Sequence, residues 1–300
     1  MSAPLVFDRS LIKVRRRRAL ALGPVTFLID RVAEDMVERL ASVMRRFAVA
    51  VDLGTPVDAL RRVLAANPQI DTLIAIDRMS GQLAPAGFRA VVAEEDMLPL
   101  APASVDLVMS GLSLQDLNDL PGAFAQIRRA LKPDGLFVAA LIGGDTLTEM
   151  RQSFAEAEAE IEGGASPRVA PFADVRAVGA LLQRAGFALP VTDLDHVTVR
   201  YDSAFALMHD LRRMGAGNAL IERRRTPLRR ATLMRVAQIY NERFADPDGR
   251  VRATFDIIWL SGWAPHASQQ QPLAPGSAKH RLADALGAQE FGSGRVQPPK

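Results

Sequence analysis

The feature that most constrains the fold is an alternation, between residues 49 and 142, of short apolar segments with stretches of helical periodicity. We expect strands at 49–53, 72–76, 90–92, 105–109 and 136–141, with helices such as 58–66 and 122–131 between them. Strands that are apolar on both sides and joined by helices form a parallel sheet with both faces covered. Short right-handed crossovers then favour a doubly wound, Rossmann-like α/β architecture.

Helical segments flank this region on both sides. Apolar residues at spacings of three and four predict a helix over 27–47. Beyond the core we expect helices at 148–161 and 175–185, a strand at 196–201, a mostly helical block at 203–244 and a last strand at 254–260. The chain therefore divides into a helical N-terminal extension (1–48), a Rossmann-like core (49–142), a helical insertion with the last strands (143–286) and a disordered tail (287–300).

Composition excludes several classes of chemistry. The chain has no cysteine, which excludes disulfides, thiolate zinc sites, iron–sulfur clusters and a cysteine nucleophile. Its four histidines are scattered without an HxxxH pair, so we predict no metal site. No apolar stretch approaches the length of a membrane span, and the arginine run at 15–18 is not followed by the pattern of a secretory signal. We expect a soluble, cytoplasmic protein without a transmembrane segment.

Charge is unevenly distributed along the chain. The formal net charge is only +3, too small to imply nucleic-acid binding by itself. Residues 49–150 hold 7 basic and 13 acidic side chains, whereas residues 211–235 hold 8 basic and one acidic. The basic block is either a surface that faces a partner or an ordinary solvated helical face. Both interpretations stay open.

Polar residues follow four of the expected strands. In an open parallel sheet, ligands bind at the carboxyl ends of the strands, where the strand order reverses. An acid about 25 residues after the first strand typically accepts hydrogen bonds from ribose hydroxyls, which is the place of Asp77. With an acidic turn after the third strand, the pattern suits a nucleoside more than a phosphate. The candidate cofactor-binding residues are Asp52, Gly54, Asp77, Arg78, Glu94, Glu95, Asp96, Ser110, Leu112 and Gln115.

Several of these motifs carry a resemblance to a known superfamily. The segments 52–54, 94–100, 105–108 and 131–135, together with Asp77, resemble the landmarks of class I S-adenosylmethionine (SAM)-dependent methyltransferases. Further segments at 6–9, 143–147, 163–167, 214–218, 263–269 and 275–278 are similar to the family of the mitochondrial complex I assembly factor that hydroxylates an arginine, and to its bacterial relatives. The malonyl-carrier-protein methyltransferase of biotin synthesis is a more distant likeness.

The resemblance implies a fold, a cofactor and a partner. It implies a seven-stranded sheet whose last strand is antiparallel, with helices inserted before that strand. It places SAM on Gly54, Asp77, the 94–96 turn and the 112–115 segment. It also implies a subunit of respiratory complex I as substrate or partner, which is compatible with a peripheral position at the inner membrane.

Two departures from the family pattern bear on activity. Only Gly54 remains of the glycine-rich first loop, while Pro56 and Asp58 replace the other glycines. We interpret Thr55 as the N-cap of the next helix, with Pro56 at its first position, and expect the altered loop to weaken cofactor binding. Gln115-Asp116 stands where relatives carry His-Trp, so no catalytic residue is assigned.

Three functions remain open at this point. The first is a methyltransferase-fold protein that binds or modifies a complex I subunit. The second is an active SAM-dependent methyltransferase that acts on a small molecule or a carrier protein. The third is a non-catalytic scaffold that docks a partner through the basic block.

Overall fold

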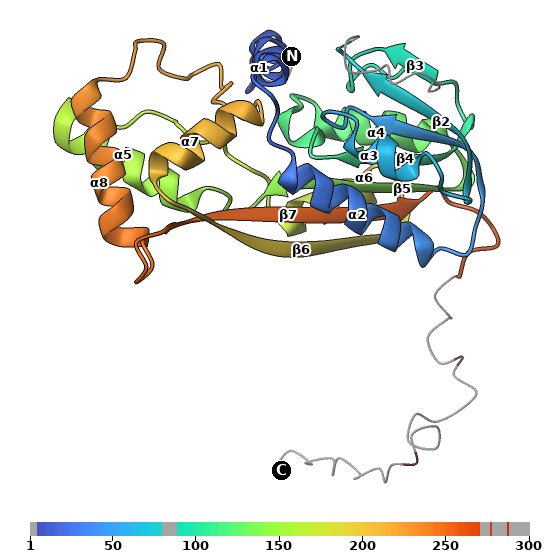
Figure 1. The fold of residues 1–300 in the computed structure, drawn as a ribbon. Coiled ribbons are helices and arrows are strands. Elements are labelled where there is room, and N and C mark those ends of the chain that lie inside the picture. Colours follow the sequence, from blue (N-terminus) through green and yellow to red (C-terminus); the bar gives the residue numbers. More distant parts are fainter. Residues whose placement is uncertain (1–4, 80–88, 271–276, 278–286, 288–300) are drawn as a thin grey trace, which may run out of the picture. The chain divides into compact units, whose positions relative to one another are not determined.

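A single mixed sheet organises the computed structural model, which describes residues 5–79, 89–270, 277 and 287. The strand order is β3-β2-β1-β4-β5-β7-β6. The first five strands are parallel, and β7 pairs antiparallel with both β5 and β6. The order reverses between β1 and β4, which places a topological switch point at their carboxyl ends. The predicted seven-stranded α/β fold is confirmed (Figure 1).

All seven predicted strands are present, most of them longer than expected. They are β1 (Phe47–Leu53), β2 (Ile70–Asp77), β3 (Arg89–Val92), β4 (Val105–Gly111), β5 (Leu131–Gly143), β6 (Ala188–Tyr201) and β7 (Val251–Trp263). The central strands are buried on both faces, which explains their continuous apolar sequence. The edge strand β3 is exposed at all four positions.

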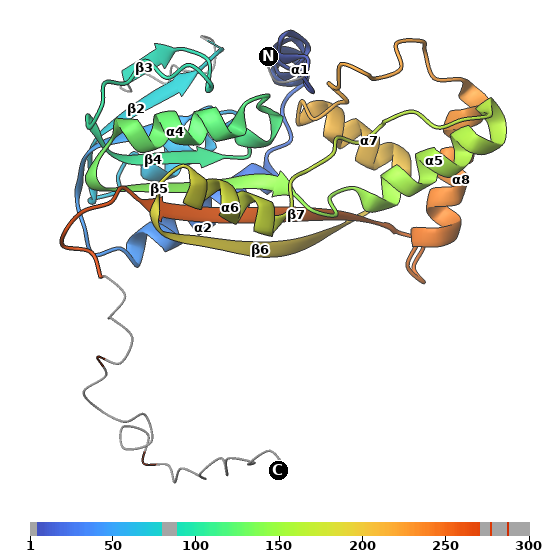
Figure 2. The same cartoon turned by 180° about the vertical axis from the view of Figure 1, so that it is seen from behind.

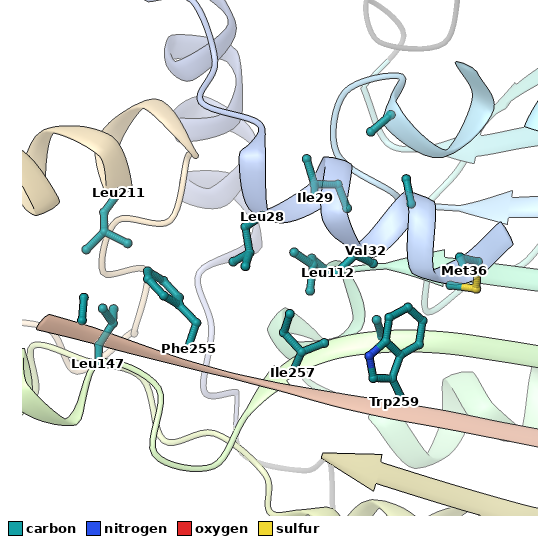
Figure 3. Packing of buried hydrophobic residues seen from close by; sticks show 14 of the residues in the cluster. Leu28, Ile29, Val32, Met36, Leu112, Leu147, Leu211, Phe255, Ile257 and Trp259 are labelled. Atoms are coloured by element: carbon teal, nitrogen blue, oxygen red, sulfur yellow. The ribbon is translucent and has the colours of Figure 1, made fainter. Parts of the chain in front are cut away.

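Helices cover both faces of the sheet. They are α2 (Phe27–Ala41), α3 (Ala59–Leu64), α4 (Leu120–Ala130), α5 (Thr148–Glu162), α6 (Val175–Arg184), α7 (Ala204–Arg213) and α8 (Arg230–Phe244). One core cluster packs α2, α3, α5, α7 and α8 on the sheet, and a second packs α4 and α6 on its other face (Figures 1 and 2). In Figure 3, Ile29 and Val32 of α2 lie over Ile257 and Trp259 of β7. The apolar stripe of α2 therefore anchors the N-terminal extension on the sheet.

The apolar pattern does not predict a further helix, α1 (Arg9–Ala21). Its N-cap is Asp8, whose carboxylate accepts a hydrogen bond from the amide of Leu11. The backbone amide of Asp8 also donates to the carbonyl of Ala219, 2.8 Å away. This end of α1 is therefore tied to the segment that follows α7.

The expected helical block at 203–244 is two helices, α7 and α8, separated by residues 214–229. The structure divides into two compact units, 1–265 and 266–300, and the sheet and the helices that cover it lie in the first. Apart from Gly287, the predicted tail at 287–300 lies outside the described residues. In the described part of the chain, no helix is both long enough and apolar enough to cross a membrane.

Candidate cofactor site and adjoining cavity

The loop after β1 approaches its neighbours so closely that a glycine is required. Gly54 has a φ of +69°, and a Cβ there would lie 2.4 Å from Ser113 Oγ and 2.8 Å from Glu95 Oε1. The Gly54 amide donates to the carbonyl of Ile76 at 2.7 Å, which ties the loop to β2. Glycine is the residue that adopts such a backbone without strain. Gly54 therefore shapes this edge of the sheet, and its predicted contact with the cofactor stays a prediction.

The rest of that loop does not form the predicted helix start. The helix begins at Ala59 rather than after Thr55, and no side chain caps it. Thr55 is fully buried, and its Oγ1 accepts a hydrogen bond from the amide of Gly111 at 2.9 Å. The Asp58 carboxylate lies 3.3 Å from Arg62 on the same helix. The N-cap interpretation of Thr55 was therefore wrong, because Thr55 joins the β1 loop to the end of β4.

Asp52 forms a buried ion pair beneath the loop. Its Oδ2 lies 2.8 Å from Arg61 Nη1, and both side chains are almost completely buried. Burial raises the pKa of Asp52 to about 6, against the opposing effect of Arg61. Arg61 also donates to the carbonyl of Val57, a non-glycine residue with a φ of +55°. The Asp52–Arg61 pair therefore holds the loop after β1 in place.

The carboxyl end of β2 carries buried polar atoms without partners. Asp77 Oδ1 accepts a hydrogen bond from the Met79 amide at 2.6 Å, while its Oδ2 is buried and has no partner among the described residues. Burial raises the pKa of Asp77. The three guanidinium nitrogens of the adjacent Arg78 also lack hydrogen bonds within the described chain, although its Nε lies 3.7 Å from Glu95. Such atoms are costly unless a ligand satisfies them.

The three acidic residues of the turn after β3 make different contacts. Glu95 is fully buried; burial by itself raises its pKa, but Arg78, Arg9 and Arg16 together lower it, so it is a carboxylate. Glu94 is half-exposed and lies 3.0 Å from Arg9. Asp96, the third acidic residue of this turn, is partly buried, and its backbone carbonyl accepts a hydrogen bond from Gln126 Nε2 at 2.6 Å.

The end of β4 and the loop after it carry three of the predicted site residues, Ser110, Leu112 and Gln115. Ser110 Oγ donates to the Leu53 carbonyl at 2.7 Å, so this predicted site residue joins two strands. Leu112 and Gln115 both line the cavity described below, and Gln115 Oε1 is buried without a hydrogen-bond partner in the described chain. Asp116 also lines the cavity, and burial raises its pKa despite the nearby Arg16.

Helix α1 covers this edge of the sheet, a role that the sequence analysis did not predict. Arg9 pairs with Glu95 and Glu94 and donates to the carbonyl of Asp116. Arg16, one of the buried residues of α1, lies 3.5 Å from the carbonyl of Gly54 and 3.9 Å from the Asp116 carboxylate. The underside of α1 thus brings two guanidinium groups to the predicted cofactor residues. The arginine run at 15–18 was the available signal, but it did not indicate which arginine turns inward.

Polar groups at the end of β2 have hydrogen-bonding capacity that the described chain does not use. The free Oδ2 of Asp77 is a buried acceptor suited to a hydroxyl group, and Arg78 supplies unsatisfied donors beside it. The missing side chain of Gly54 lets Ser113 and Glu95 pack against the loop after β1. Of the ten predicted residues, Asp52 and Ser110 instead hold the framework of this edge.

A cavity of about 490 Å³ adjoins these loops. It shares Pro56, Val57 and the 112–116 region with the ends of β1 and β4, and α1, α5 and α7 enclose it. Figure 3 shows side chains of its wall, where Leu28, Leu211 and Phe255 point toward one another. Its size is typical of a pocket for a small molecule or a side chain. Within the described residues, no cluster of histidine and acidic side chains forms a metal site.

The fold and this edge define a protein of the methyltransferase superfamily. Residues 51–139 match the family described as "Methyltransferase domain". Solved structures with the same fold include the YcgJ protein of Bacillus subtilis (TM-score 0.52, 13% identity, 78% of this chain and 98% of that one) and the [4+2]-cyclase SpnF (TM-score 0.52, 14% identity, 88% and 98%).

Similarity to curated proteins extends well beyond that domain. The chain is 38% identical to the mitochondrial arginine-hydroxylase NDUFAF5 of Danio rerio, over 93% of this chain and 89% of the relative. The human arginine-hydroxylase NDUFAF5 is 37% identical over 91% and 81%. The malonyl-[acyl-carrier protein] O-methyltransferase of Methylovorus sp. is 33% identical over 93% and 98%. The chain belongs to the methyltransferase-domain family that contains these proteins, and this membership supports SAM as its cofactor.

Proposed function

We propose that this protein binds SAM at the ends of β1, β2 and β3 and acts in the assembly of respiratory complex I by modifying one of its subunits. Similarity to the arginine hydroxylases over 93% of the chain carries this proposal, because it includes the N-terminal helices and the insertion outside residues 51–139. The buried, unpartnered Oδ2 of Asp77 supports the cofactor part. When bound, SAM would supply the family's group-transfer chemistry.

The protein's own residues have separable tasks in this proposal. Asp77 accepts a hydrogen bond from a nucleoside hydroxyl, and Gly54 allows the close packing of Ser113 and Glu95 that shapes the loop beside it. Helix α1 covers the site through Arg9 and Arg16 and thereby excludes water. The cavity beside Gln115 receives the group to be modified.

Calorimetric titration with SAM tests the cofactor part. We expect Asp77→Ala to weaken binding by about tenfold to a hundredfold, the range for losing one hydrogen bond to a charged acceptor. Asp71→Ala is the matched control, because Asp71 lies on the same strand but is exposed and pairs with Arg46. Absence of heat with the wild-type protein, or equal losses in both variants, would contradict SAM binding at this edge.

A gene deletion tests the assembly part. We expect reduced complex I activity in membranes of the deletion strain, restored by the wild-type gene but not by Asp77→Ala. Normal complex I activity in the deletion strain would remove the assembly role while leaving SAM binding intact.

A second candidate is O-methyl transfer to a carboxylate, as the name of the malonyl-[acyl-carrier protein] relative indicates for that protein. The arginines around the cavity favour it, since they would orient an anionic acceptor. A carboxylate is already deprotonated near neutral pH, so this acceptor needs no general base. Mass spectrometry of a malonyl thioester incubated with SAM and the protein would show a methyl ester if this candidate is correct.

A further inference from the structure

A histidine and a buried aspartate form a pair at the carboxyl end of β5, outside the proposed cofactor site. His196 of β6 and Gly143 of β5 both lie opposite Asp256 in the register of β7. His196 Nδ1 is 2.6 Å from Asp256 Oδ1. The Asp256 side chain is 2% exposed, whereas that of His196 is 65% exposed. A carboxylate that is shielded from water therefore has a partner that exchanges protons freely with the solvent.

Asp256 also holds the turn that follows β5. Its Oδ2 accepts a hydrogen bond from the amide of Asp145 at 2.8 Å. Gly144 has a φ of +53°, and a Cβ there would lie 2.4 Å from the same oxygen, so the turn packs directly on the carboxylate. The turn continues into α5 through Thr146 and Leu147, which both line the cavity. A weaker hold on the Asp145 amide therefore acts on the wall of the cavity.

Few other contacts hold this turn. The amide of Gly144 donates to the carbonyl of Ala173 at 3.0 Å, and the amide of Leu147 donates to the carbonyl of Thr254 at 2.8 Å. Leu147 has a φ of +55°, a backbone conformation that costs free energy for a residue with a side chain. A strained turn with so few bonds depends on each of them, including the one to Asp256.

The other charged groups at this end of the packed elements do not pair with Asp256 in the described part of the chain. They are Asp145 in the turn, Glu149 in α5, Asp174 and Arg176 at the start of α6, Asp195 and Arg200 on β6, and Arg252 on β7. Glu149 accepts hydrogen bonds from Thr254, and Asp174 accepts one from the amide of Ala177. Asp195 pairs with Arg31, while Arg200 and Arg252 both pair with Asp246. The charge of His196 is thus the one that balances Asp256.

We propose that the His196–Asp256 pair is a proton-sensitive switch that controls the turn at 143–147 and, through it, the wall of the cavity. An imidazole changes its charge between about pH 5 and 8. Protonated His196 balances the charge of Asp256, whereas neutral His196 leaves a buried carboxylate without a counter-charge, which is costly. The hold on the turn is therefore complete at the acidic end of this range and weakens as the pH rises. The switch goes beyond the proposed function, because it involves neither SAM nor a modified subunit.

Amide hydrogen exchange of the full-length protein, followed by NMR between about pH 5.5 and 8, tests the switch. The test variant is His196→Asn, which keeps an N–H donor near the position of Nδ1 but carries no charge. We expect the protection of the Asp145 amide in the wild type, divided by that in the variant, to fall about threefold to fivefold as the pH rises, the range for an ion pair with one exposed partner. The ratio cancels the effect of pH on exchange chemistry and on other titrating groups.

His209→Asn is the matched control. His209 is also exposed, and its Nδ1 lies 4.0 Å from a carboxylate oxygen of Asp210 on α7. We expect the same ratio, formed with this variant, to stay constant across the pH range. Both histidines are exposed, so neither substitution removes a buried side chain.

The methyl group of Met150 provides a second readout at the cavity. Met150 lies in the first turn of α5 and lines the cavity. In protein labelled at the methionine methyls, we expect its resonance to show a transition with the same midpoint as the His196 ring protons. That transition should be absent in His196→Asn. Met36, which is buried beneath α2, is the reference that should not follow this midpoint.

A constant ratio for His196→Asn, or an equal fall for His209→Asn, would overturn the proposal. A Met150 resonance that does not follow the His196 ring would also overturn it, since the proposal links the turn to the cavity wall. None of these measurements uses SAM. A failure to bind SAM would therefore count against the proposed function alone, and a turn that does not respond to pH would count against the switch alone.

Discussion

Gly54 sits where three segments of the chain meet, and its missing side chain is part of the site. Its φ of +69° and the nearby Ser113 and Glu95 both exclude a Cβ. We expect Gly54→Ala to destabilise the fold by about 1–3 kcal/mol through backbone strain and to abolish SAM binding. Gly164→Ala is the control, because nothing lies within 4 Å of a Cβ built there. Urea unfolding and a SAM titration of both variants measure the difference; equal stability of the two would contradict this account.

The buried pair of Asp52 and Arg61 predicts the direction in which the folding stability changes with pH. The folded-state pKa of Asp52, about 6, lies above its ordinary 3.8, so the folded state binds the proton more tightly. The contribution of Asp52 to stability is therefore complete below pH 4 and is lost as the pH rises to 6. A shift of this size corresponds to about 3 kcal/mol.

Asp52→Asn removes this titration and isolates it from other groups. We expect the free energy of unfolding of the wild type, minus that of the variant, to fall as the pH rises from 4 to 6. Urea unfolding at several pH values measures it. A difference that stays constant or rises across this range would show that Asp52 remains ionised throughout.

The sequence predicted the position of a site residue correctly where a strand fixes it, while the contact of that residue with a cofactor stays a prediction. Asp77 ends a buried parallel strand, so its side chain had to lie at the carboxyl edge. Thr55 shows the opposite case, because its predicted N-cap role depended on where a helix begins. The capping pattern at 55–58 was favourable locally, but Thr55 accepts a hydrogen bond from the distant Gly111 instead. A contact between segments this far apart leaves no local signal.

Helix α1 was missed because its buried face is not apolar. The buried positions are Ile12, Arg16 and Ala19, and only one of them is a large apolar residue. Periodicity of apolar residues detects helices such as α2, whose inward stripe is entirely apolar. A helix that is held by arginine–carboxylate pairs has no such stripe, so apolar periodicity does not predict it.

The attachment of α1 depends on Arg9, which leads to a prediction about local unfolding. Arg9→Met removes a partner of the buried Glu95 and should weaken the docking of α1 by several kcal/mol. We expect faster amide hydrogen exchange in residues 9–21 and unchanged exchange in β5 and β7. Arg17→Met on the exposed face is the control. Unchanged exchange of α1 in Arg9→Met would show that this pair does not hold the helix.

Several arginines of the basic block at 211–235 form ion pairs with acidic residues of the same chain. Arg223 pairs with Asp8, Arg224 with Glu162 and Arg235 with Glu160. These contacts connect the insertion to α1 and α5. Reversing the charge at 223–225 would therefore disturb internal packing as well as any partner surface, and Arg225, which is exposed, is the better position to change.

At the scale of the whole molecule, the alternation of strands and helices predicted the core, and the resemblance supplied the antiparallel last strand. Neither the alternation nor the resemblance predicted how the N-terminal extension contacts the insertion. Phe7 forms a bridge with Leu220, so the two regions that flank the core in the sequence join each other. The cavity lies among these parts and could not be placed before that contact was known.

A ligand that binds the folded state alone should stabilise the whole unit. We expect SAM at about 100 times its dissociation constant to stabilise the protein by about 2.7 kcal/mol and raise the melting temperature by several degrees. Thermal unfolding with and without SAM measures this, with Asp77→Ala as the variant in which the shift shrinks. A melting temperature unaffected by SAM at that ratio would contradict binding to the native fold.

The docking of α1 also sets an order of events during synthesis. Asp8 bonds to Ala219, which the ribosome adds 211 residues later. At typical elongation rates, this leaves the arginine-rich helix without its final neighbours for about 10–40 s. The cover of the site is thus made well before the segment that holds it in place, and during that interval the nascent chain presents a strongly cationic segment to its surroundings.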